Sequence, residues 1–252
     1  MTQPTTPRNG AELDAPTTVE PKKPEKASLL DDFMDIFYAP SSVFARRANA
    51  SFWIPLLIVS VLLGVIFLAN RDLFDPIMEA EFARAMAKSS QQLTPDQMAA
   101  ARKFSGMFTS VAAFVGPPIA MLLLGVVIWI VGKFFDAKES VNAALVVATF
   151  AYVPRVVEGI VNRVQGLIVN TDSLNSRYSL SLGLGRFFDA DKTSPLLLGL
   201  IGRIDVFTIW VTVLIAIGLA VTGKISRAHA AIAAAIIWLL GALPSLAGAL
   251  RG

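Results

Sequence analysis

Val111–Val131 has the sequence VAAFVGPPIAMLLLGVVIWIV, an apolar stretch without a charged side chain. A helix rises about 1.5 Å per residue, so about 20 apolar residues cross the hydrocarbon core of a bilayer. Four other stretches have a similar length and composition, namely Phe52–Ala69, Val141–Val161, Ile204–Val221 and Ala230–Leu250. We therefore predict an all-α integral membrane protein, built as a bundle of five spanning helices.

The composition of the chain agrees with a membrane protein. Of its 252 residues 54% are hydrophobic and 16% are charged, whereas soluble domains carry about 25% charged residues. The formal net charge is +3, and the basic residues are scattered between the apolar stretches. Nucleic-acid binding requires a concentrated basic surface, so we predict no nucleic-acid partner. The absence of cysteine excludes thiolate catalysis and cysteine metal sites.

The chain begins with a polar segment, residues 1–27, which is rich in proline and threonine. Such a segment buries too little apolar surface to offset the entropy cost of ordering, so we predict a disordered tail. It also lacks the early apolar core of a cleavable signal peptide. The first span is therefore expected to act as an uncleaved insertion signal.

The next segment has the pattern of an amphipathic helix. Ser28 and Asp31 have the spacing of a capping box, Pro40 marks the end of the helix, and a second short helix is expected over Ser41–Arg47. Its apolar residues share one predicted face: Leu29, Leu30, Phe33, Met34, Phe37 and Tyr38. The residues on the opposite face are Asp31, Asp32 and Asp35. Three interpretations stay open: the helix lies in the bilayer interface, docks a partner, or packs on its own spans.

The connection between the first two spans has helix signals of its own. Thr94 and Gln97 form a second capping box, and Asp75-Pro76 has a capping side chain before a proline. We predict a helical hairpin with the arms Pro76–Lys88 and Pro95–Phe108. The second arm leads into the next span.

Two of the predicted spans contain prolines. Gly116-Pro117-Pro118 is expected to break or kink the second span, because each proline removes a backbone donor. Pro154 in the third span would free the carbonyl of Phe150 for a water or a neighbouring side chain.

Charged side chains within spans are costly, which makes them a functional-site hypothesis. Arg155 and Glu158 lie three residues apart in the third span, so they share a helix face and can form an ion pair. Arg203 and Asp205, at the start of the fourth span, are candidate partners across the helix interface. This polar cluster either lines a path for an ion, proton or lipid headgroup, or fixes helix packing. Its position toward the span ends favours the packing role.

Positive charges close to the span ends predict the orientation. Arg46-Arg47 precede the first span, and the short connections Gly132–Ser140 and Thr222–His229 carry two cations each. Counted over whole connections, the two sides of the membrane carry equal numbers of basic residues. The basic residues close to the span ends therefore decide in favour of a cytoplasmic N-terminus. The short connections also make the second and third spans, and the fourth and fifth, antiparallel neighbours.

Three local sequences resemble the bacterial branch of the Yip (Ypt-interacting protein) domain family. They are DDFMDIFYAPSSVF at 31–44, TFAYVP at 149–154 and RIDVFTIWVTVLIAIGLAV at 203–221, and the resemblance covers residues 29–250. It implies a multi-span protein of the bacterial cytoplasmic (inner) membrane with a cytoplasmic N-terminus. The link of eukaryotic members to Rab-type GTPases is not carried over, because no Rab-contact residues can be matched. The long segment Asn70–Ser110 also departs from the short loops of those members.

No catalytic, cofactor-binding or metal-binding residue is predicted. The chain has one histidine, His229, and lacks the His-Glu-x-x-His and Gly-x-Ser-x-Gly motifs. We expect a non-enzymatic membrane scaffold or adaptor of Yip type. Its partners would be the bilayer and, through the N-terminal helix, another membrane or cytoplasmic protein. The alternative is a transporter or channel component that uses Arg155, Glu158 and Asp205, although five spans do not divide into two equal halves.

Overall fold

The computed structural model describes residues 27–88 and 93–243. The tail predicted over residues 1–27 lies outside them except for Ala27, and so does the last part of Ala230–Leu250. The α-helices are α1 (Leu29–Asp35), α2 (Pro40–Arg47), α3 (Trp53–Ala69), α4 (Arg71–Lys88), α5 (Pro95–Lys133), α6 (Val141–Ala151), α7 (Pro154–Gly166), α8 (Pro195–Ile201), α9 (Val206–Thr222) and α10 (Arg227–Leu240). Two short 3-10 helices, η1 (Thr171–Ser173) and η2 (Leu184–Phe187), lie between α7 and α8.

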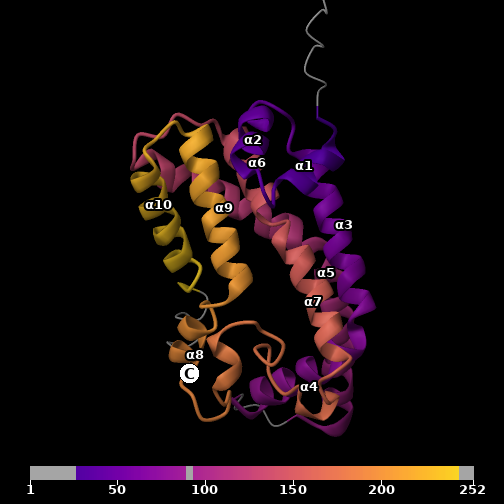
Figure 1. Cartoon of the computed structure of the whole chain (residues 1–252). Coiled ribbons are helices and arrows are strands. Elements are labelled where there is room, and N and C mark those ends of the chain that lie inside the picture. The colour runs from indigo at the N-terminus through magenta and orange to yellow at the C-terminus, as the bar shows by residue number, and fades with distance from the viewer. Residues whose placement is uncertain (1–26, 89–92, 244–252) are drawn as a thin grey trace, which may run out of the picture.

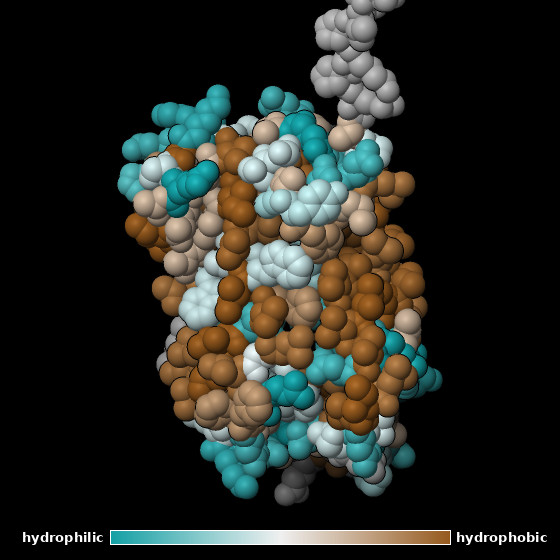
Figure 2. Space-filling view, in the orientation of Figure 1, coloured by the Kyte–Doolittle hydropathy of each residue, from teal (hydrophilic) through white to brown (hydrophobic). Residues whose placement is uncertain are grey.

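The long helices run between two ends of the molecule (Figure 1). One end holds α1 and α2 and is called the α1–α2 end; the other holds α4 and α8 and is called the α4 end. Figure 2 shows hydrophobic residues over most of the middle of this face and hydrophilic residues gathered at both ends. This distribution is the one expected of a protein whose middle lies in hydrocarbon.

Within the described ranges, two segments are long and apolar enough to cross a bilayer: α5, and Val141–Gly166, which contains α6 and α7. A third is added when α3 and α4, which are bent by 82° at their junction, are taken as one broken span. Helices α9 and α10 are apolar but shorter. The predicted all-α membrane fold is confirmed at this level, and the number of five spans stays a prediction.

The core of the bundle is centred on α6. All of its residues from Ala143 to Ala151 are buried, and α6 packs between α5 and α9. Glycines allow this close approach: a Cβ at Gly125 would lie 2.6 Å from a methyl group of Leu145. A Cβ at Gly218 would similarly overlap Val147. Small residues are what membrane helices use to approach closely, because lipid supplies no hydrophobic driving force between them.

The connection between α3 and α5 is helical, as predicted, but its first arm starts earlier. Helix α4 begins at Arg71, and Pro76 lies inside it. The reason is Asn70, whose main-chain carbonyl accepts from the N–H groups of Leu73 and Phe74 and so starts the first turn. The Asn70 side chain donates to the carbonyls of Ile66 (2.9 Å) and Gly159 (3.1 Å), which anchors the corner to α7.

The second arm begins as predicted and continues without interruption. Thr94 and Gln97 form the capping box, with bonds of 2.9 and 3.3 Å. Of the break or kink predicted at Gly116-Pro117-Pro118, the break is wrong, since α5 is a single helix from Pro95 to Lys133. A membrane helix tolerates prolines when neighbouring helices, Ser or Thr side chains or local adjustments satisfy the backbone carbonyls that they free.

The third predicted span consists of two helices instead of one. Helix α6 ends at Ala151 and α7 begins with Pro154 as its first residue. Proline favours this position, because the N–H it lacks has no partner there. The carbonyl of Phe150 accepts from the main-chain N–H of Val153 at 3.2 Å. The prediction that this carbonyl awaits a water or a side chain is therefore wrong.

Candidate functional site

The predicted ion pair in the third span is present. Arg155 Nη1 donates to Glu158 Oε2 at 2.6 Å, one turn further along α7. Arg155 Nη2 also donates to Thr208 Oγ1 of α9 at 2.9 Å. The side chains of Arg155 and Glu158 are 27% and 24% exposed, respectively, so the pair is not fully enclosed by protein. The arginine thus joins α7 to α9, a contact that sequence reasoning missed because Thr208 carries no charge.

Asp205 is buried and serves its own helix. Its Oδ1 accepts from the N–H groups of Phe207 (2.9 Å) and Thr208 (3.2 Å), which caps the N-terminus of α9. Its Oδ2 accepts from the hydroxyl of Ser181 at 2.8 Å. In the described part of the chain Asp205 forms no ion pair with Arg155 or Arg203. An aspartate directly before an apolar run is an N-cap signal, and it could have predicted this role.

Arg203 lies apart from the other members of the predicted cluster. Its Nη1 donates to the carbonyl of Gly241 at 2.9 Å, and its guanidinium lies 5.4 Å from the ring centre of Trp238. The indole N–H of Trp238 in turn donates to the Arg203 carbonyl at 3.3 Å. A cation at the C-terminal carbonyls of a helix is favourable, so Arg203 fastens the end of α10. The four predicted residues therefore do not form one cluster: Arg155 pairs with Glu158, Asp205 caps α9, and Arg203 binds the end of α10.

A cavity of about 410 Å³ opens beside the ion pair, between α3, α5 and α7. A second cavity of about 250 Å³ shares Glu158, Asn162 and Arg177 with it and reaches Ser181. Both lie toward the α4 end. The remaining lining residues of the larger cavity include Leu63, Ile66, Phe67, Phe74, Ala112, Ala113, Pro117, Tyr152 and Gly159.

Toward the α1–α2 end the polar lining gives way to apolar side chains. The last turns of α6 bury Val146, Val147 and Phe150 directly beyond Tyr152. The charged pair therefore borders a pocket that is closed by apolar side chains of α6 toward the α1–α2 end. This arrangement suits a brace between helices better than a path through the bundle.

The N-terminal helices form a hairpin held by charges. Asp32 is fully buried and pairs with both Arg46 and Arg47 of α2, and Arg46 also pairs with Asp35. Arg47 further donates to the carbonyl of Ala27 at 3.2 Å. The capping box of Ser28 and Asp31 is confirmed. Asp32, predicted on the polar face of the helix, is instead buried inside the hairpin, because Arg46 and Arg47 after the turn neutralise it. The aspartates before Pro40 and the arginines after it were the sequence signal for this pairing.

The six apolar residues predicted on one face of α1 are divided between two faces. Leu29, Phe33 and Phe37 pack against the core. The ring centre of Phe33 lies 5.6 Å from that of Phe150, and the ring centre of Phe37 lies 5.4 Å from that of Trp210. The other three residues are exposed, namely Leu30 (76%), Met34 (63%) and Tyr38 (71%). These three are spaced by four residues and are called the α1 stripe.

One buried acid was not singled out by the sequence. Glu139, in the connection between α5 and α6, is 3% exposed, and neither of its carboxylate oxygens has a hydrogen-bond partner in the described residues. A Cβ at Gly132 or Gly223 would strike these oxygens, so the two glycines make room for the carboxyl group. Burial raises the pKa of Glu139, and the nearby charge of Lys133 opposes this only in part.

Comparison with known proteins adds two findings. A family model described as the Yip1 domain matches residues 34–248, from α1 to beyond α10. Membrane protein YknW of Bacillus subtilis (strain 168) is 25% identical over 217 residues, which cover 85% of this chain and 86% of that protein. No solved structure matches the chain.

Proposed function

This chain belongs to the Yip1 domain family, and we propose that it is a non-enzymatic membrane scaffold or adaptor that docks another protein through the α1 stripe. The observation that carries the proposal is the exposure of Leu30 and Met34 on α1 and of Tyr38 in the turn after it, on a segment whose opposite side packs on the bundle. A docking surface held in place loses little conformational entropy when it binds. Methionine suits such a surface because its flexible side chain adapts its shape to a partner. Tyrosine suits it because it adds a hydroxyl group to a large apolar area.

Charge favours a protein over the lipid interface as the occupant of the α1 stripe. Three aspartates against two arginines leave the segment 27–47 with one excess negative charge. Helices that lie on anionic membranes usually carry a basic polar face. The arginines here are engaged within the hairpin, with Asp32 and Asp35. The partner we propose presents an apolar groove bordered by basic residues.

The Arg155–Glu158 pair is assigned a packing role in this proposal. It joins α7 to α9 through Thr208, and the apolar residues of α6 lie between its pocket and the α1–α2 end. A transporter would need a polar route past α6. Flux through proteoliposomes that contain the wild type, Glu158→Gln or Asp205→Asn tests this directly. We expect no ion or proton flux above that of empty liposomes, and flux in the wild type that is lost in Glu158→Gln would contradict the assignment.

A photo-cross-linking amino acid introduced separately at Leu30, Met34 and Tyr38 tests the docking function in intact cells. Leu57 on α3 is similarly exposed and serves as the matched control position. We expect discrete adducts with one protein at the three stripe positions and lipid adducts alone at Leu57. Lipid adducts alone at all four positions would overturn the proposal.

A further inference from the structure

Helix α5 carries an exposed apolar stripe that extends past the segment predicted to span the membrane. Its members follow one another every three or four residues, which places them on one helix face. The α5 stripe begins with Phe104, Phe108, Val111, Val115 and Ile119 and continues through Leu123 and Val126 to Ile130, all of them exposed. Phe104 and Phe108 are the most exposed of these, at 70% and 65%.

The α5 stripe is longer than a bilayer is thick. At a rise of about 1.5 Å per residue, the distance from Phe104 to Ile130 is about 39 Å, whereas a hydrocarbon core measures about 30 Å. The part of α5 around Phe104 and Phe108 therefore lies at or beyond the edge of the core if the helix stands upright. An apolar surface of this kind needs a cover.

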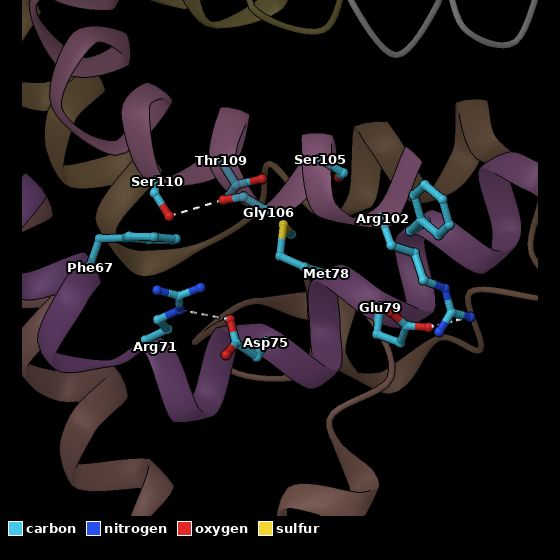
Figure 3. Close-up of a pocket in the computed structure, with 11 residues that line it drawn as sticks. Phe67, Arg71, Asp75, Met78, Glu79, Arg102, Ser105, Gly106, Thr109 and Ser110 are labelled. Atoms are coloured by element: carbon cyan, nitrogen blue, oxygen red, sulfur yellow. Dashed lines mark hydrogen bonds and ion pairs between the residues drawn. The ribbon is translucent and has the colours of Figure 1, made fainter. Parts of the chain in front are cut away.

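The side of α5 that faces α4 is polar (Figure 3). A pocket of about 200 Å³ separates the two helices, and Ser105 and Thr109 line it from α5. Arg71 of α4 points into it, and Arg102 of α5 bridges to Glu79 of α4 at 2.8 Å. A helix pair in water buries its apolar faces and exposes its polar ones. Phe67, Met78 and Phe82 also line the pocket. The reversed order therefore applies to α5, which turns Ser105 and Thr109 toward α4 and Phe104 and Phe108 outward, as lipid on its outer side requires.

The direction of α4 agrees with this environment. Helix α4 is bent by 82° away from α3 and so lies across the end of the bundle. Leu73 and Ile77 on its other side are buried against Leu174 and Leu180, so α4 is held in this position. Arg102 and Lys103 directly precede Phe104, where long basic side chains reach the head-group region.

We propose that the Phe104–Val111 part of α5 is embedded in the lipid leaflet at the α4 end, with the α4–α5 pocket at the level of the head groups. Lipid is preferred to a second copy as the occupant because the α5 stripe continues without interruption into Val115–Ile130, the side that a spanning helix turns to lipid. Under the predicted orientation this leaflet is the outer one.

The absence of cysteine allows a clean test. Single cysteines at Phe104, Met107 or Phe108 carry a nitroxide label in the full chain, reconstituted into phosphatidylethanolamine and phosphatidylglycerol liposomes. Ser105 and Thr109 are the matched positions on the pocket side of the same turns. Collisions of each label with oxygen, which enriches in lipid, and with a nickel chelate, which stays in water, are measured by electron paramagnetic resonance.

We expect oxygen collisions to dominate at Phe104, Met107 and Phe108 and nickel collisions to dominate at Ser105 and Thr109. Equal access of the nickel chelate at all five positions would show that this face of α5 lies in water, which would overturn the proposal. A second copy of the chain would instead shield the labels at Phe104 and Phe108 from both reagents. It would also broaden their spectra by spin–spin interaction, and mixing in unlabelled protein would remove the broadening. Such a result would overturn the proposal. Phe104→Trp provides a measurement without a label: its added fluorescence should be quenched by lipids brominated on the acyl chains, and absence of quenching contradicts embedding.

Discussion

The α1–α2 end and the α4 end both hold acid–base pairs, but they bury them to different depths. In the α1–α2 hairpin, the carboxylate of Asp32 is inaccessible to solvent and lies between Arg46 and Arg47. At the α4 end, Asp72 pairs with Arg163 at 2.7 Å, and both side chains are about half exposed. Removing one partner of an ion pair should therefore have different effects at the two ends. A buried pair that loses one partner leaves an uncompensated charge, whereas an exposed pair exchanges its partner for water.

The largest effect is expected for Asp32→Ala. The substitution leaves two guanidinium groups without their buried partner, so we predict a loss of about 3–5 kcal/mol of unfolding free energy. Unfolding of the detergent-solubilised protein by sodium dodecyl sulfate, followed by circular dichroism, measures this. Asp35→Ala is the matched control, because Asp35 pairs with Arg46 alone and is partly exposed. Equal losses of unfolding free energy in the two variants would show that burial of the carboxylate does not determine how much an ion pair contributes.

A smaller effect is expected for Glu158→Ala. The pair with Arg155 is about one-quarter exposed, and Arg155 keeps its bond to Thr208, so part of the lost interaction is compensated. We predict a loss of about 1–3 kcal/mol, below the range for a fully buried pair. Glu158→Gln keeps a hydrogen-bond acceptor for Arg155 and should lose less. If Glu158→Gln lost more unfolding free energy than Asp32→Ala, the strongest ion pair would be Arg155–Glu158 and not the one in the α1–α2 hairpin.

Glu139 predicts a dependence on pH. Its pKa in the folded protein is raised above the ordinary value of 4.5, so the folded state retains a proton that the unfolded state releases. The contribution of Glu139 to the unfolding free energy should therefore be fully present below pH 4.5 and be lost as the pH rises through the raised pKa. Glu139→Gln cannot ionise, so it should be more stable than the wild type at pH 7, and this advantage should vanish below pH 4.5.

The control for this comparison is Asp136→Asn in the same connection. Asp136 is exposed and has a φ of 59°, a conformation that asparagine also adopts readily. Its unfolding free energy should keep the pH dependence of the wild type. An unchanged pH profile in Glu139→Gln would show that the buried carboxyl group is already ionised in the folded protein.

The smallest effect is expected for Asp72→Asn at the α4 end. Its pair with Arg163 is exposed, and we predict no measurable change in unfolding free energy at moderate salt. The same unfolding assay at low and high salt checks this. A loss comparable to that of Asp32→Ala would mean that the α4 end is shielded from water, as deep immersion of the whole end in lipid would produce.

Local features of the fold followed from the sequence because they depend on neighbouring residues. The apolar run at Val111–Val131, the capping box at Thr94 and the ion pair of Arg155 with Glu158 all involve residues within one helix. The Yip resemblance was also carried by local strings. The run, the capping box and the ion pair can be obtained from helical periodicity and spacing, whereas the resemblance depends on the quoted strings themselves.

The features that were missed depend on where helices cross. Arg203 binds the end of α10, 38 residues away, instead of joining the predicted cluster. Asp32 turned inward because α2 folds back on α1 and brings Arg46 within reach. Helical periodicity assigns residues to faces, but it does not determine which face another helix covers. The division of the apolar residues of α1 between core and surface has the same origin.

The corner at Asn70 has a consequence for the order in which the protein is assembled. Its side chain bonds the carbonyl of Gly159, which lies 89 residues later in the chain. At a synthesis rate of about 5–20 residues per second, the ribosome needs roughly 4–18 s to make that stretch. During this interval α3 and α4 are complete, but their angle lacks the bond that anchors it to α7. The geometry of the first span is therefore completed only when the third is in place.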